Sequence, residues 1–257
     1  MNNRLAGMLL ALSMATLPAL AAALPATAAA PPPLKSLRHL VFTANVATHQ
    51  STEYSGGKAI DDPYGGTAQV EVIDKKADVE LVCDIVAATG DNGLVVDITE
   101  NSPDRHVALT RVGIHSNGEL TYLAPGQPLN EEEAVLLRFL ARNVIGPDAH
   151  AVGDSWSVEN TGDSFKSTTK FSVTAVRAPD EEDVNLDESF QSTGARGYTG
   201  VRHGRVSYDP TKLVPLKAAV QSTTRAQQSM QQYTTVVVSM NFTLKEDSFP
   251  KHEGVGR

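Results

Sequence analysis

Apolar and polar residues alternate along most of the chain, which is the pattern of strands that bury one face. The strongest run is 233–244, with Val236, Val237 and Val238 at its centre. The pattern predicts strands at 37–47, 67–73, 78–87, 94–100, 106–114, 119–123, 155–159, 165–178, 184–192, 198–208, 213–223 and 233–244. Polar stretches at 50–66, 179–183 and 224–232 are predicted to be loops.

One segment departs from alternation and predicts a helix at about 130–145. Asn130 suits the N-cap, and Glu133 stands three residues later, which is the spacing of a capping box. Arg138 and Arg142 are predicted to lie on the polar side, and Gly146-Pro147 ends the helix. The apolar stripe comprises Ala134, Leu136, Leu137, Leu140, Ala141 and Val144.

This combination of elements indicates a mainly β fold. An open sheet of many strands curls, closes or splits, and a single helix can cover part of one concave face. We therefore predict a strongly curved antiparallel sheet, half-barrel-like, wrapped around one amphipathic helix. It would form a single β-rich domain over 37–246, followed by a polar tail at 247–257.

The start of the chain is typical of an export signal. Arg4 precedes an apolar run from Leu5 to about Leu24, which closes on the small residues Ala26-Thr27-Ala28. We predict a signal peptide at 1–28 with cleavage after Ala28, a Pro-rich leader at 29–36, and a periplasmic or secreted location. The alternative is a retained membrane anchor, which the prolines within the apolar run disfavour. No cysteine follows the run, so a lipoprotein is not expected.

The net charge limits which partners the protein can bind, and the cysteine content limits how its fold can be stabilised. The formal net charge is −8, without a basic stripe, which argues against nucleic acid and anionic lipid head groups as partners. The single cysteine, Cys83, excludes an internal disulfide, and its apolar surroundings predict a buried side chain. Cleavage at Ala28 leaves about 230 residues, enough for one large β domain or two small ones.

No motif for catalysis or metal binding is found. The histidines are scattered, and His115 and His203 offer only a remote possibility of a shared site. Ser167 and Lys170 have catalytic spacing, but alternation places them on opposite faces of a strand. The acidic run 180–183 lacks the glycine and terminal glutamate of a calcium loop, and is predicted to be a solvated turn. The sequence predicts no catalytic residue, metal ligand or cofactor, and leaves the ligand-binding residues unknown.

One set of motifs carries a resemblance. The helix, then Gly153-Asp-Ser-Trp156, then a meander with Gly204, Tyr208-Asp-Pro210 and Pro215, resembles uncharacterised bacterial exported β-meander proteins. The order of elements is also similar to the half-barrel of periplasmic lipoprotein carriers. That similarity implies a hollow for acyl chains between helix and sheet, although no residue motif carries the activity over. Trp156 is predicted to be a core or sheet-edge anchor.

Three functional hypotheses follow. The first is an exported soluble domain that binds a hydrophobic or lipid-like molecule between helix and sheet. The second is a structural or protein-interaction domain of the cell envelope without a small-molecule site. The third is a hydrolase with an unrecognised site. The space between helix and sheet distinguishes them.

Cleavage after Ala28 is directly testable. In a bacterium that exports the protein, N-terminal sequencing of the processed form should begin at Ala29, because a signal peptidase accepts small residues before the cut. An Ala28→Asp variant should accumulate as the precursor. A processed form that begins elsewhere, or full-length protein retained in the cytoplasm, would contradict the prediction.

Overall fold

The alternating segments form one antiparallel β-sheet, which a computed structural model describes over residues 34–54, 70–102, 105–106, 109–124, 128–142, 151–161, 165–177, 181–192, 197–229 and 232–249. The elements in these ranges are β1 (Arg38–Tyr54), β2 (Val70–Ala88), β3 (Leu94–Ser102), β4 (Arg105–His106), β5 (Thr110–Ile114), β6 (Leu120–Tyr122), α1 (Glu131–Phe139), β7 (Ser155–Thr161), β8 (Phe165–Arg177), β9 (Glu181–Ser192), β10 (Tyr198–Asp209), β11 (Val214–Ser229) and β12 (Gln232–Asp247). The predicted signal peptide, leader residues 29–33, helix residues 143–145 and tail residues 250–257 lie outside the described residues.

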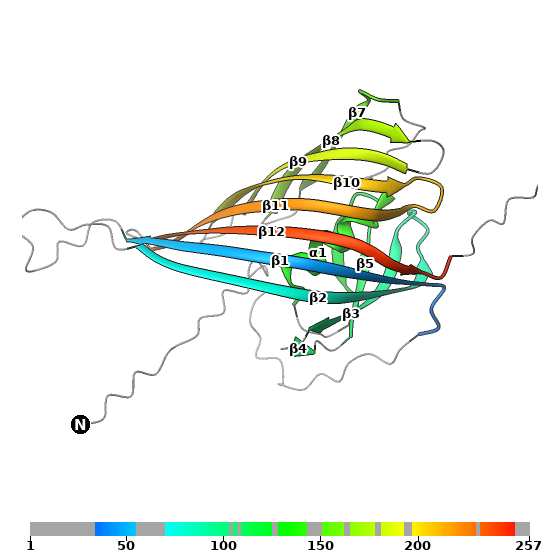
Figure 1. Cartoon of the computed structure of the whole chain (residues 1–257), viewed down its shortest axis with the longest axis horizontal. Coiled ribbons are helices and arrows are strands. Elements are labelled where there is room, and N and C mark those ends of the chain that lie inside the picture. The colour runs from blue at the N-terminus through cyan, green and yellow to red at the C-terminus, as the bar shows by residue number, and fades with distance from the viewer. Residues whose placement is uncertain are drawn as a thin grey trace, which may run out of the picture.

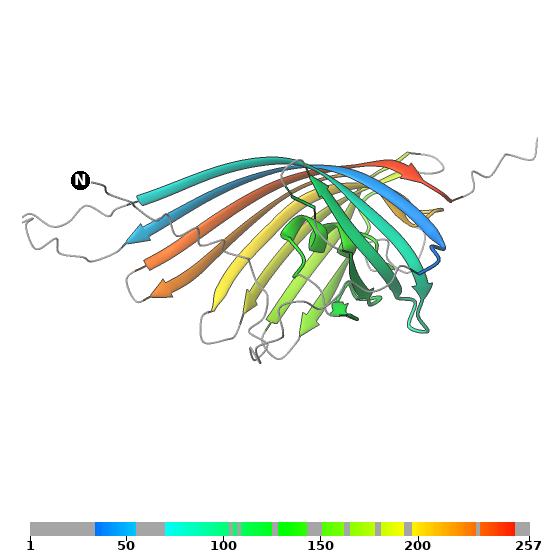
Figure 2. The ribbon, with the colours of Figure 1, turned by 90° about the horizontal axis from the view of Figure 1, so that it is seen from below.

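The first and last strands pair at the centre of the sheet (Figure 1). From β1 the sheet continues through β2, β3 and β5 to β6, and from β12 through β11, β10, β9 and β8 to β7. β4 pairs with β3 outside this path. The two wings curve towards the same side, where α1 lies (Figure 2). The fold is therefore the predicted open, strongly curved sheet around one helix.

The concave face carries the apolar core. On β1, Leu40, Phe42 and Ala44 are buried and alternate with residues that face the other side. Their neighbours on β12 continue the same face, because the register places Ala44 opposite Phe242. Phe139 of α1 meets the Phe242 ring edge-on, with centroids 6.5 Å apart. The helix therefore completes a core that the sheet begins.

The start of the helix is confirmed, but its predicted end is wrong. Asn130 is the N-cap, its backbone N–H donates to Glu133 Oε2 at 2.7 Å, and three glutamates occupy the first turn. The α-helix stops at Phe139, and Leu140 and Ala141 continue as a turn whose apolar side chains are still buried. Tertiary contact with the sheet thus extends the apolar stripe beyond the regular helix.

Several polar stretches outside the predicted strands are strand in the structure. β2 runs unbroken through Asp74, Lys75 and Lys76, β1 continues to Tyr54, and β11 continues to Ser229. On the concave side of these extensions, Thr52 and Thr234 are buried, and their hydroxyls lie 3.3 Å apart. Threonine is β-branched and suits a strand. A stretch without apolar alternation can therefore still form a strand.

The acidic run 180–183 also differs from its prediction. Described from Glu181, it begins β9 and is not a solvated turn. Asp183 is 2 % exposed; it accepts a hydrogen bond from Ser207 Oγ at 2.6 Å and forms ion pairs with Arg177 and Arg205. These partners hold the pKa of Asp183 below its usual value against the opposing effect of burial.

The contribution of α1 to the core can be measured. A Phe139→Ala variant should lose about 3–5 kcal/mol of unfolding free energy, because a large buried ring is removed and a cavity remains. Urea unfolding followed by circular dichroism measures the loss. The control is Arg142→Ala, an exposed position beside the same turn, where a change within about 0.5 kcal/mol is expected. Equal effects in the two variants would contradict the assignment of α1 to the core.

Candidate functional site

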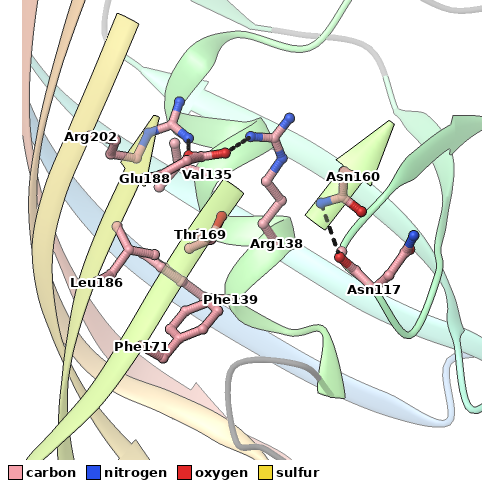
Figure 3. Close-up of a pocket in the computed structure, with 11 residues that line it drawn as sticks. Asn117, Val135, Arg138, Phe139, Asn160, Thr169, Phe171, Leu186, Glu188 and Arg202 are labelled. Carbon is pink, nitrogen blue, oxygen red and sulfur yellow. Dashed lines mark hydrogen bonds and ion pairs between the residues drawn. The ribbon is translucent and has the colours of Figure 1, made fainter. Parts of the chain in front are cut away.

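The interface between α1 and the wing formed by β7 to β10 combines apolar packing with buried charge (Figure 3). Val135 and Phe139 of the helix face Phe171 of β8 and Leu186 of β9 across a small cavity. Trp156 of β7 stacks on Phe171, with ring centroids 5.5 Å apart and planes 19° apart. Trp156 is thus an anchor of the sheet edge, as predicted.

A buried ion network joins the helix to this wing. Glu188 of β9 pairs with Arg202 of β10, and their side chains are 5 % and 9 % exposed. Arg138 of α1 lies 3.7 Å from Glu188, and Glu131 of α1 lies 3.4 Å from Arg202. Two arginines therefore alternate with two carboxylates, so the network is close to neutral. Arg138 was predicted to be on the polar side of the helix; its side chain is 35 % exposed, and it also reaches Glu188 of the sheet.

Burial shifts the pKa of one arginine of the network and of a tyrosine close to it. Burial lowers the pKa of Arg138, which Glu188 partly offsets. Burial likewise raises the pKa of Tyr198 on the neighbouring strand β10. Charges removed from water need partners to compensate for their lost hydration, so each member of the network depends on the others.

The other wing also holds the helix. Asn130 Nδ2 donates to Glu100 Oε2 of β3 at 2.6 Å, and Glu100 is 2 % exposed. Because Asn130 is also the N-cap, this bond fixes the first turn of α1 to the β3 side. The helix is therefore tied by polar contacts to both wings of the sheet.

The cavity beside α1 is small, with a volume of about 30 Å³. A cavity needs about 10–15 Å³ to hold one water molecule, so this one suits about two. Two buried polar atoms of its lining residues, Arg202 Nε and Asn160 Oδ1, have no hydrogen-bond partner within the protein. The lining consists of Asn117, Gly118, Val135, Arg138, Phe139, Asn160, Thr169, Phe171, Leu186, Glu188 and Arg202.

The two wings meet at this cavity. Asn160 Nδ2 of β7 donates to the carbonyl oxygen of Asn117 at 3.3 Å, in the turn between β5 and β6. In that turn Gly118 has φ of 82°, as the predicted Asn-Gly hairpin requires. The contact narrows the opening of the half-barrel on the side where α1 lies.

The histidines do not form a shared site. His115 pairs with Asp91, whereas His203 pairs with Asp187 on the neighbouring strand. Within the ranges that the structure describes, no three His, Cys, Asp or Glu side chains form a group that could hold a metal ion. In the same ranges, no helix has the length and apolar character needed to span a membrane.

One histidine does have the connections of a proton relay. His115 Nδ1 lies 3.2 Å from Asp91 Oδ2, and its Nε2 lies 3.1 Å from Thr121 Oγ1. Hydrogen bonds from Thr89 and His115 lower the pKa of Asp91 to about 2. All four residues are exposed, and none lines the cavity beside α1. A hydrolase requires a site that also positions the substrate, so this arrangement alone does not favour the third hypothesis.

Two further predictions are confirmed. Ser167 is buried while Lys170 is exposed, so they lie on opposite faces of β8. Cys83 is fully buried, and burial raises the pKa of its thiol far above the usual range. A thiol in this state is a poor nucleophile, so Cys83 acts as a small apolar residue of the core.

The network that joins helix and sheet was missed by sequence reasoning, although a signal was present. In β9 the alternation that buries Val184, Leu186 and Phe190 also places Glu188 on the inner face. A charged residue at an inward position indicates a buried partner of opposite charge. The identity of that partner depended on register and helix position.

No protein-family model matches this sequence, and a search of curated proteins found no match.

Removing the central carboxylate of the network should be costly. Glu188→Gln leaves two arginines without their shared counter-charge, and we expect a loss of about 3–5 kcal/mol of unfolding free energy. The matched control is Asp187→Asn on the same strand, where the side chain is 62 % exposed and a loss below about 1 kcal/mol is expected. Urea titrations of both variants measure the two losses of unfolding free energy. A Glu188→Gln loss no larger than the control would show that the network adds little.

Proposed function

We propose that the chain is an exported structural or protein-interaction domain of the cell envelope, in which α1 is a permanent part of the core. The observation that supports this most is the filling of the concave face. Between α1 and the β7 to β10 wing, the described residues leave about 30 Å³. That volume holds water molecules, whereas small-molecule sites measure about 300–1,000 Å³.

The energetics favour the same proposal. Four apolar side chains of α1 are buried: Val135, Leu136, Leu137 and Phe139. Returning each to water costs about 1.5–3 kcal/mol. The sum is comparable to the whole unfolding free energy of a typical domain, about 5–15 kcal/mol. A ligand that displaced the helix would have to offset this cost.

The surface offered to a partner lies elsewhere. β1, β2, β11 and β12 extend beyond the other strands as a long ribbon (Figure 1). Residues 71–78 of β2 are all exposed, including the apolar side chains of Val72 and Ile73. A rigid body with a projecting ribbon suits a domain that contacts another polypeptide. The predicted signal peptide supports a location outside the cytoplasm.

A second candidate function is binding of an amphiphilic molecule after α1 moves. It is favoured by one observation, the pairing of apolar lining with two arginines and two unpartnered polar atoms. The acyl part would occupy the space of Phe139, and the anionic part would meet Arg138 and Arg202. The cost of displacing α1 makes this the weaker candidate.

Native mass spectrometry of the protein purified from the envelope of its own cells separates the two candidates. We expect the mass of the polypeptide alone, and no rise in the unfolding temperature when a fatty acid or lysophospholipid is added, because the cavity of about 30 Å³ beside α1 is too small for an acyl chain. A co-purified lipid, or saturable binding of a fluorescent fatty acid, would overturn the first candidate in favour of the second.

A further inference from the structure

Among the described residues, the outer half of β2 lies at an edge of the sheet. Over residues 70–79 it pairs with β1, and in the described part of the chain its pairing with β3 begins only at Glu80. An edge strand presents unpaired N–H and C=O groups that can pair with another strand. Figure 2 shows this part of β2 along the outer side of the projecting ribbon.

We propose that this edge pairs antiparallel with the same edge of a second copy of the chain, so that two sheets become continuous. The proposal rests on the proposed interaction function and names its partner. Most homo-oligomers are two-fold symmetric, and a two-fold axis perpendicular to the sheet relates antiparallel copies of one strand. Each residue then stays on its own face, so the strand must be centred on a residue.

Charge selects the residue at the centre. With Ile73 on the axis, Glu71 of each copy lies opposite Lys75 of the other, which gives two ion pairs on one face. Centring on Asp74 places two carboxylates opposite one another, and centring on Lys75 does the same with two ammonium groups. Centring on Val72 places Glu71 opposite Ile73 and Val70 opposite Asp74, so it gives no ion pair between these residues.

The point at which β3 begins to pair with β2 is compatible with the same register. With Ile73 at the centre, Val70 lies opposite Lys76 of the second copy, before the position at which β3 begins to pair. The paired segments therefore meet without displacing β3. Ile73 faces the concave side, since its neighbour on β1 is Gln50, so the two isoleucines cover each other's exposed surface.

A cysteine scan tests the register. In purified protein under mild oxidation, Ile73→Cys should give a covalent dimer, because residues directly opposite in antiparallel strands have Cβ atoms close enough for a disulfide. Val72→Cys and Asp74→Cys should not, because each lies opposite a different residue. Cys83 is buried and serves as the internal negative control. No dimer from Ile73→Cys, or equal yields from all three variants, would overturn the register.

Charge reversal tests the association itself. Light scattering coupled to gel filtration should give twice the chain mass for the wild type, and Glu71→Lys or Lys75→Glu should weaken the dimer about tenfold or more. The double variant should restore it. Lys217→Glu, an exposed position on the inner strand β11, makes the same charge change and should have no effect.

The outcomes separate this inference from the proposed function. A wild type with the mass of one chain, or a double variant that stays monomeric, overturns self-pairing while leaving the lipid-free interaction domain intact. A co-purified lipid overturns the proposed function whatever the oligomeric state.

Discussion

The docking of α1 onto the concave face is the contact on which the rest of the fold depends. The described residues form one curved open sheet with an apolar face and no second sheet to cover it, and a chain with a single cysteine has no internal disulfide to compensate. Nine helical residues and the following turn supply the cover, with Phe139 against Phe242 at its centre. The two wings of the sheet curve towards the helix. A hydrogen bond from the Asn160 side chain to the carbonyl oxygen of Asn117 joins the wings across the opening.

Polar contacts at the margins of α1 fix where the helix sits. Apolar packing alone allows a short helix to slide or rotate over a smooth face. The bond from Asn130 to Glu100 and the ion pairs around Glu188 select one position, because any displacement would leave buried charges without partners. The same contacts leave little space beside the helix, so the interior is organised as a core, while the exposed surface of the ribbon remains available to other polypeptides.

The alternation of apolar and polar residues predicted the fold class, because a strand that buries one face has an apolar residue at every second position. The N-cap at Asn130 identified the helix. The ribbon was less predictable. Asp74, Lys75 and Lys76 face solvent on both sides of β2, so no apolar period marks them as strand. The buried ion network depended on contacts between residues as distant in sequence as Glu131 and Arg202, which no local pattern specifies.

Whether α1 is a permanent part of the core can be measured directly by hydrogen exchange of the native protein. If the helix leaves the sheet only on global unfolding, the backbone amides of its second half, from Val135 to Phe139, should exchange with the same opening free energy as those of the central strands β1 and β12. Exchange of these helix amides at a much lower opening free energy, with the central strands still protected, would identify α1 as a movable cover and contradict the account.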